Sequence, residues 1–267
     1  MQSATLPDGR TISCVNAYEV DFSVHEIFSE DLPAHGLDLP PDGVYLDVGA
    51  NIGLFSLYLR DHCPRARIVG FEPMPEAFAA FAANAAALNP PAAAVHLALG
   101  DHAGWLEFDY FPGIAALSTQ NREVGQRMSA GLRAMLGGGQ ANDGVRDVLD
   151  RTGAAGVAAD AAFLDRLFTP QTVRAQVATL SSEMRRLGID RVDLLKVDTE
   201  GAEREVLAGL DAEDWGKIRQ LMIEVHLGER VLAEMEAELR GRGFRTSTGR
   251  HPLCRDGAEV FHIYAAR

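Results

Sequence analysis

The chain has 267 residues, a hydrophobic fraction of 47% and a formal net charge of −13 at pH 7. The length favours one α/β domain that carries an insertion, and the hydrophobic fraction is sufficient for a sizeable core. The acidic charge argues against nucleic acid as the main partner, because binding to phosphates needs a basic surface.

Cysteine usage and hydropathy indicate the compartment. Cys14, Cys63 and Cys254 are far apart and fit no metal spacing, so we expect reduced thiols. The first residues, MQSATLPDGRTISCV, show no basic segment followed by an apolar one. No apolar run approaches the ~20 residues of a membrane-spanning helix. The sequence therefore predicts a cytoplasmic protein without a membrane partner.

Residues 1–43 are predicted to form a flap that packs on the main domain. Pro7-Asp8-Gly9 supplies the turn chemistry of a short hairpin. The segment VHEIF (24–28) then leads through polar sequence to the turn at Pro40-Pro41-Asp42-Gly43.

Residues 44–267 are predicted to form one domain in which strands alternate with helices. Such alternation implies a mostly parallel sheet covered on both faces, here with seven strands and an antiparallel edge made by the last two. The Ala- and Gly-rich residues 118–172 interrupt the alternation, and we expect a helical insertion there that serves either as a lid or only as decoration. Strands are expected at 44–48, 67–73, 94–100, 105–111, 192–198, 218–226, 244–249 and 259–266, and helices at 52–62, 75–88, 202–210 and 229–243.

The stretch VYLDVGANIGLFSLYL (44–59) runs from an apolar strand through two glycines into an apolar helix, which is typical of a ligand-binding turn. A nucleoside triphosphate site requires Gly-x-x-x-x-Gly-Lys-[Ser/Thr], and no Lys follows Gly53. A dinucleotide site requires glycine where this chain has Asn51, and Asp47 places negative charge where a pyrophosphate would bind. These two features disfavour an NAD-dependent oxidoreductase, which is kept as the alternative from another class of enzyme.

S-adenosylmethionine meets neither objection, because it has no phosphate and carries a sulfonium and an ammonium. A carboxylate at the first turn then helps, and Glu72 at the next strand end can accept hydrogen bonds from the ribose hydroxyls. Asp101, after the third strand, is expected to bind the adenine amino group. Parallel strands end on one rim of the sheet, so these groups are predicted to line one site. The expected cofactor-binding residues are Asp47, Gly49, Asn51, Gly53, Glu72, Pro73 and Asp101.

Four segments carry a family pattern: DVGANIGLFSL (47–57), GFEPMPEAF (70–78), VDLLKVDTEGAEREVLAGL (192–210) and DWGKIRQLMIEVH (214–226). Together they resemble the FkbM-like S-adenosylmethionine-dependent methyltransferases, and the resemblance extends over nearly the whole chain. It implies a Rossmann-like class I methyltransferase fold with S-adenosyl-L-methionine as the cofactor. The most similar subgroup O-methylates hydroxyls of polyketides and macrolides, either free or bound to an acyl-carrier protein. Other branches methylate sugars and other small metabolites.

The chain departs from that subgroup at three places. His25 stands where the subgroup commonly has Arg, and TEGAE (199–203) replaces VEKSE. An MSG motif is present only loosely, as Ala116-Leu117-Ser118. These positions lie in the flap, at a strand end and in the insertion, so they bear on the acceptor more than on the cofactor.

Methyl transfer to a hydroxyl requires an aligned acceptor oxygen and removal of its proton. Alignment can lower the barrier by ~7–11 kcal/mol, and a general base adds roughly 10²–10⁴-fold in rate. His226, at the end of the strand 218–226, is the first candidate for this base, and Glu224 on the same face would orient it. Asp198 and Lys196 at the neighbouring strand end complete the candidate catalytic group. Weaker candidates for contact with the acceptor are His25, Glu26 and Glu200.

Two further expectations concern a metal and a protein partner. Asp198, Glu200, Glu224 and His226 could bind Mg²⁺, which would acidify the acceptor hydroxyl, but nothing in their spacing requires a metal and metal-free base catalysis is preferred. Docking of an acidic carrier protein would need a basic patch. Five arginines are candidates for it: Arg122, Arg127, Arg133, Arg185 and Arg186. The sequence predicts neither the acceptor nor the oligomeric state.

Overall fold

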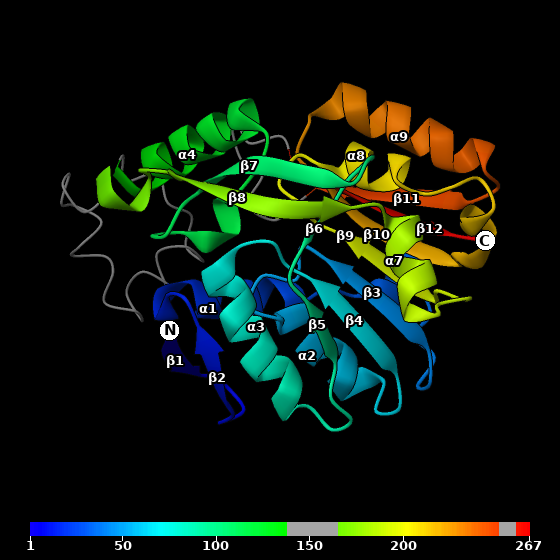
Figure 1. The fold of residues 1–267 in the computed structure, drawn as a ribbon, viewed down its shortest axis with the longest axis horizontal. Helices are drawn as coiled ribbons and strands as arrows, with labels where there is room; N and C mark the ends of the chain where they lie inside the picture. Colours follow the sequence, from blue (N-terminus) through cyan, green and yellow to red (C-terminus); the bar gives the residue numbers. More distant parts are fainter. Residues whose placement is uncertain (138–164, 251–259) are drawn as a thin grey trace.

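The computed structural model describes residues 1–137, 165–250 and 260–267, and its centre is a seven-stranded sheet (Figure 1). The strand order is β11-β12-β10-β9-β3-β4-β5. Neighbours from β10 to β5 pair in parallel, while β12 is antiparallel to both β10 and β11. The predicted sheet is therefore confirmed, except that the last strand lies inside it. The strands are β3 (Val44–Val48), β4 (Arg67–Phe71), β5 (Ala93–Val95), β9 (Leu194–Val197), β10 (Gln220–Val225), β11 (Arg245–Arg250) and β12 (Phe261–Ala266).

Helices cover both faces of this sheet. Successive side chains of a strand point to opposite faces, so Leu46 and Val48 of β3 face one layer while Tyr45 and Asp47 face the other. Leu46 and Val48 join a core with α7 (Leu180–Leu187), α8 (Glu203–Ala208) and α9 (Glu229–Gly241). Tyr45 packs in a second core with α2 (Leu54–His62). The face toward α2 is the one that carries the polar residues described below.

The residues before β3 pack outside α2 and α3 (Pro75–Ala87). β1 (Gln2–Thr5) and β2 (Thr11–Cys14) form the predicted hairpin. The helix α1 (Ala17–Phe28) follows and was absent from the prediction, because only Val20 and Val24 are buried on it and the apolar pattern is short. Apolar side chains of this region cluster against α2 and α3; they are Leu6, Ile12, Cys14, Val20 and Val24.

A second, three-stranded sheet corrects one expectation. β6 (Ala98–Leu99), β8 (Gln171–Ala178) and β7 (Gly104–Tyr110) form it in that order. The prediction of one strand over 94–100 is wrong, because the chain leaves the main sheet at His96, whose ring stacks on Phe78. β7 alternates between exposed and buried side chains and pairs antiparallel with β8, which is typical of a sheet with one solvated face.

The predicted insertion begins as a helix, α4 (Arg122–Gly137), and the rest of it up to residue 164 lies outside the described residues. In Figure 1, α4 lies beside β7 and β8. Among the described helices, none is long and apolar enough to cross a bilayer. Three short 3₁₀ helices complete the described chain: η1 (Leu32–His35), η2 (Ala115–Leu117) and η3 (Asp214–Lys217).

The turn after β3 makes a close contact with the end of β9. Gly49 has a φ of +80°, and a Cβ atom added there would lie 1.7 Å from the carbonyl oxygen of Asp198. The N–H groups of Gly49 and Ala50 both donate to the carbonyl oxygen of Phe71, at 3.1 and 3.0 Å. The turn is therefore held between β4 and β9, and only glycine fits at its first position.

Replacing Gly49 by Ala is expected to lower the free energy of unfolding by roughly 3 kcal/mol or more, because backbone strain adds to a clash with main chain. Gly243→Ala is the matched control: its φ is +89°, but no atom lies within 4 Å of the added Cβ. We expect a loss of about 1 kcal/mol there, from strain alone. Chemical denaturation followed by circular dichroism measures both, and equal losses would contradict the close contact.

Candidate active site

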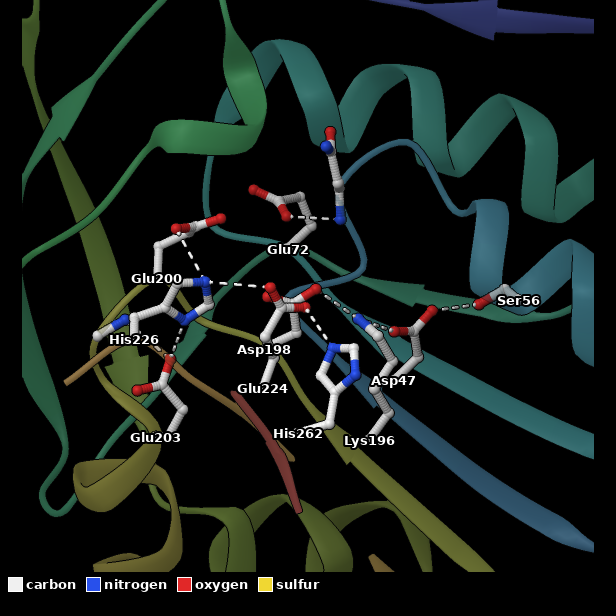
Figure 2. Close-up of polar contacts among 12 residues, drawn as sticks. Asp47, Ser56, Glu72, Lys196, Asp198, Glu200, Glu203, Glu224, His226 and His262 are labelled. Carbon is white, nitrogen blue, oxygen red and sulfur yellow. Dashed lines mark hydrogen bonds and ion pairs between the residues drawn. The ribbon is translucent and has the colours of Figure 1, made fainter. Parts of the chain in front are cut away.

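The candidate site lies where β3, β4, β9 and β10 end, on the sheet face covered by α2. Lys196 of β9 is the register partner of Asp47 in β3 and of Met222 in β10. Glu224 of β10 is likewise opposite His262 of β12. Strand alternation therefore places these polar side chains on one face, where Figure 2 shows them gathered.

At the β3–β4 side, backbone and side-chain donors fix two buried carboxylates. Asp47 accepts a hydrogen bond from the Ser56 hydroxyl at 2.9 Å. Glu72 accepts from the N–H of Asn51 at one oxygen and from the N–H of Met74 at the other, both at 2.8 Å. Burial raises the pKa of Glu72 to about 7, although the two N–H groups oppose the shift. Glu72 is thus held in one orientation at the tip of β4.

Lys196 connects this side to the end of β9. Its ammonium lies 3.0 Å from Asp198 Oδ2 and 3.6 Å from Asp47 Oδ1. Burial opposes the charged form, but Asp198 and Asp47 outweigh it and raise the pKa of Lys196 above its ordinary value. Burial also raises the pKa of Asp198, against the opposing effect of Lys196. Lys196 is therefore a permanent cation between two strand ends.

His226, after β10, is fully buried among carboxylates. Its Nδ1 lies 3.0 Å from Glu203 Oε1, and its Nε2 lies 3.2 Å from Glu200 Oε2 and 3.3 Å from Glu224 Oε1 (Figure 2). Burial by itself lowers the pKa of His226, but Glu200, Glu203 and Glu224 raise it well above the usual value. The surrounding carboxylates therefore favour the imidazolium form of His226.

Glu203 is a site residue that the sequence analysis assigned only to its helix. It is fully buried, and its Oε1 accepts both the N–H of Gly201, at 2.8 Å, and the Nδ1 contact of His226. The available signal was its place in the first turn of a helix that begins soon after the strand end at Asp198. Glu200 itself has a φ of +52°, which aims its side chain back toward His226.

His262 is a second residue that the sequence analysis missed. Its Nε2 lies 3.5 Å from Glu224 Oε2, and its Nδ1 lies 3.0 Å from the hydroxyl of Tyr264. That hydroxyl also donates to Glu30 Oε1 at 2.5 Å. The available signal was a polar residue within the otherwise apolar strand FHIYAA, but the register that places it against Glu224 is a tertiary feature.

The start of the insertion contacts this group. The Thr119 hydroxyl donates to the carbonyl oxygen of Glu200, and the guanidinium of Arg127 donates to the carbonyl oxygen of His226. Gly201 packs against Val124 so closely that an added Cβ would lie 2.9 Å from its Cγ2. The insertion therefore begins at the site itself.

Other predicted residues lie elsewhere. Asp101 follows β6 of the second sheet rather than a strand of the main one, and its carboxylate pairs with exposed His102 at 2.6 Å. The shared rim that motivated its adenine-binding role is therefore absent, and that role is only a prediction. His25 and Glu26 lie on α1, which packs against α2, so neither is at a strand end. The Pro73 carbonyl oxygen lies 3.1 Å from His96 Nε2.

The five arginines do not form one patch, so that prediction is wrong. Arg127 is directed at the His226 carbonyl, and Figure 1 shows α4 and α7 well apart along the molecule. The other four are paired with acidic side chains: Arg122 with Asp109, Arg133 with Asp165, Arg185 with Asp211 and Arg186 with Glu183.

The sequence profile of the methyltransferase FkbM domain matches residues 47–246, from the first strand tip to β11. The chain belongs to the FkbM methyltransferase family. This assignment favours methyl transfer over the hydride transfer of the NAD-dependent alternative. All four strand ends that build the site lie inside the matched range.

Two similar sequences match this chain over nearly its whole length, and one solved structure resembles its fold. The 31-O-demethyl-FK506 methyltransferase FkbM of Streptomyces tacrolimicus is 34% identical over 100% of this chain and 97% of its own length. The AMB antimetabolite synthetase AmbE of Pseudomonas aeruginosa is 33% identical over 98% of this chain, which matches only 12% of AmbE. The crystal structure of the methyltransferase FkbM of Methylobacillus flagellatus superposes with a TM-score of 0.52 at 11% identity, over 85% of this chain and 44% of that one. The predicted Rossmann-like class I methyltransferase fold is confirmed.

Replacing Glu203 by Gln is expected to lower the pKa of His226, because a neutral amide removes one of the charges that stabilise the imidazolium. Histidine-labelled NMR across a pH titration measures this. Glu205→Gln is the control, since Glu205 is exposed on the same helix. An unchanged His226 titration in Glu203→Gln would show that this contact does not set its protonation.

Proposed function

We propose that this chain transfers a methyl group from S-adenosyl-L-methionine to a hydroxyl of a polyketide, macrolide or other secondary metabolite. One observation carries the proposal: an oriented carboxylate at the tip of β4 and a carboxylate–histidine group at the tips of β9 and β10 share one rim. Family membership supports methyl transfer. The relative from Streptomyces tacrolimicus supports oxygen as the acceptor atom, because its name places the missing methyl on O-31.

The residues at the β3 and β4 tips fit the cofactor. Glu72 is held by two N–H groups, and each of its oxygens retains a lone pair for a ribose hydroxyl. Asn51 Oδ1 is buried without a hydrogen-bond partner among the described residues, so it can accept from an ammonium donor. Asp47 is fully buried, and we propose that it shapes the turn through Ser56 and Lys196 rather than contacting the ligand. When bound, the cofactor supplies a methyl group on a positively charged sulfur.

We propose that Asp198, Glu224 and His226 receive the acceptor's proton. The carboxylates of Asp198 and Glu224 keep 26% and 13% of their side-chain surface exposed, while His226 is buried behind them. Glu203 holds Nδ1 of His226, so that Nε2 is directed toward the two carboxylates. Burial raises the pKa of Asp198, which makes its ionised form a better proton acceptor. The acidic surroundings also stabilise a cationic donor.

The acceptor and its mode of delivery belong to the same proposal. The match to a segment that makes up 12% of a synthetase supports an acceptor handled within a larger biosynthetic protein, and we propose that this acceptor is carrier-bound. The start of the insertion contacts Glu200 and His226, which supports a role for it in covering that acceptor.

Glu72→Gln is expected to weaken S-adenosylmethionine binding by about 10-fold or more, because a hydrogen bond to a charged acceptor contributes roughly 1.5–3 kcal/mol. Glu72 has a pKa of about 7, so it is protonated below that pH and ionised above it. Wild-type affinity should therefore rise as the pH increases through 7, whereas the affinity of Glu72→Gln should not.

Isothermal titration at several pH values measures both effects, with exposed Glu107→Gln as the control. If NAD bound and S-adenosylmethionine did not, the proposed function would be wrong.

His226→Gln is expected to lower the rate of methyl transfer by roughly 10²–10⁴-fold while leaving the dissociation constant for S-adenosylmethionine near its wild-type value. Labelled methyl transfer to 31-O-demethyl-FK506 and to hydroxyacyl-carrier proteins supplies the assay. Unchanged turnover in this variant would remove His226 from the proton-accepting group.

A further inference from the structure

We propose that Asp198, Glu224 and His226 form a binding site for one divalent cation, and that Mn²⁺ is the ion best suited to it. The binding itself is independent of the proposed function. Its role deepens that function, because the ion would lie where the acceptor's oxygen is expected.

The three ligand atoms come from two adjacent strand ends. One ligand atom from each of Asp198, Glu224 and His226 lies within 4.8 Å of the others. Ligand atoms around an ion with bonds of about 2.1 Å lie about 3 to 4 Å apart, so small side-chain rotations suffice to close the site. Glu224 and His226 are two residues apart along β10, and Asp198 follows the parallel neighbour β9. The main chain therefore already holds the three residues at a suitable separation.

An independent observation concerns His226. Its Nε2 is fully buried and makes no hydrogen bond among the described residues, although it is directed at the carboxylates. Its Nδ1 is held by Glu203 (Figure 2), and the carboxylate of Glu203 in turn accepts the N–H of Gly201. A carboxylate that holds one nitrogen of a histidine while the other nitrogen faces an ion is the usual outer shell of a metal site.

Neighbouring side chains contact particular oxygens of the two carboxylates. Lys196 is paired with Asp198 through Oδ2, which leaves Oδ1 on the other side of the carboxylate. His262 faces Glu224 Oε2, while Oε1 of the same residue faces His226.

The donor set indicates the ion. Mg²⁺ prefers oxygen ligands alone. Carboxylates suit Mn²⁺ and imidazole suits the later ions of the first transition row, so two carboxylates with one imidazole fit an ion at the Mn²⁺ end of that row. A thiolate, which would favour softer ions, is absent from the three. With the ion in place, Asp198, Glu224 and His226 would hold it rather than accept the proton. An acceptor hydroxyl bound to the ion would lose its proton more readily, to a nearby carboxylate such as Glu200.

Mn²⁺ titration of the chelator-treated full chain, followed by electron paramagnetic resonance, tests the site without any cofactor or acceptor. We expect one saturable Mn²⁺ per chain. Asp198→Asn and Glu224→Gln should each weaken binding at least 10-fold, and Glu203→Gln roughly 10- to 100-fold through the orientation of His226. Glu229→Gln, an exposed residue paired with Arg250, is the matched control and should bind as the wild type does. Thermal unfolding confirms that each variant is folded.

A measurement on the unmodified chain avoids dependence on the variants. Mn²⁺ should broaden the NMR signals of the His226 and His262 rings well before those of exposed His102. Absence of saturable binding, equal broadening of all histidines, or unchanged affinity in the folded Asp198 and Glu224 variants would overturn the site. Full methyl transfer in the presence of a chelator would overturn the ion's role while leaving the proposed function intact. Saturable Mn²⁺ binding without S-adenosylmethionine binding would support the site and contradict the proposed function.

Discussion

The arrangement of the site depends on one buried ammonium. Lys196 lies between Asp47 and Asp198, which end adjacent parallel strands and would otherwise bring two carboxylates together out of water. Removing one partner of such a buried ion pair lowers the free energy of unfolding by roughly 3–5 kcal/mol, because an uncompensated charge remains. The same two strands meet at Gly49, where main chain touches main chain. Charge and packing thus fix the distance between the cofactor side and the histidine side of the rim.

The carboxylates around His226 lie close together and are largely buried, so their mutual repulsion must be compensated by the rest of the fold. Burial raises the pKa of Glu200 well above its usual value, and Asp198, Glu224 and Glu203 act in the same direction against the effect of His226. Like charges held this close destabilise a fold unless a cation or a proton separates them. Titratable groups with strongly shifted pKa values concentrate at functional sites, where stability is given up for chemistry. A cationic methyl donor and a divalent ion are both suited to such surroundings.

Much of this could be predicted from sequence because strand alternation is local. The ends of β3, β4, β9 and β10 can be predicted because each is an apolar run that ends in polar residues. Because parallel strands end at the same edge of a sheet, these polar residues could be expected to lie together. The strand before Asp101 was mispredicted because the chain leaves the main sheet at His96, and no local pattern shows that departure. His262 was missed because β12 inserts between β10 and β11, so its contact with Glu224 depends on a pairing between strands distant in sequence.

The junction between the insertion and the strand ends limits how this enzyme's selectivity can be altered. Thr119 and Arg127 donate to the main chain of Glu200 and His226, two members of the carboxylate–histidine group. A chimaera that takes this insertion from a relative would therefore disturb these contacts unless the crossover point lies beyond Arg127. Residues 119–127 are therefore better treated as part of the scaffold than as part of an exchangeable segment.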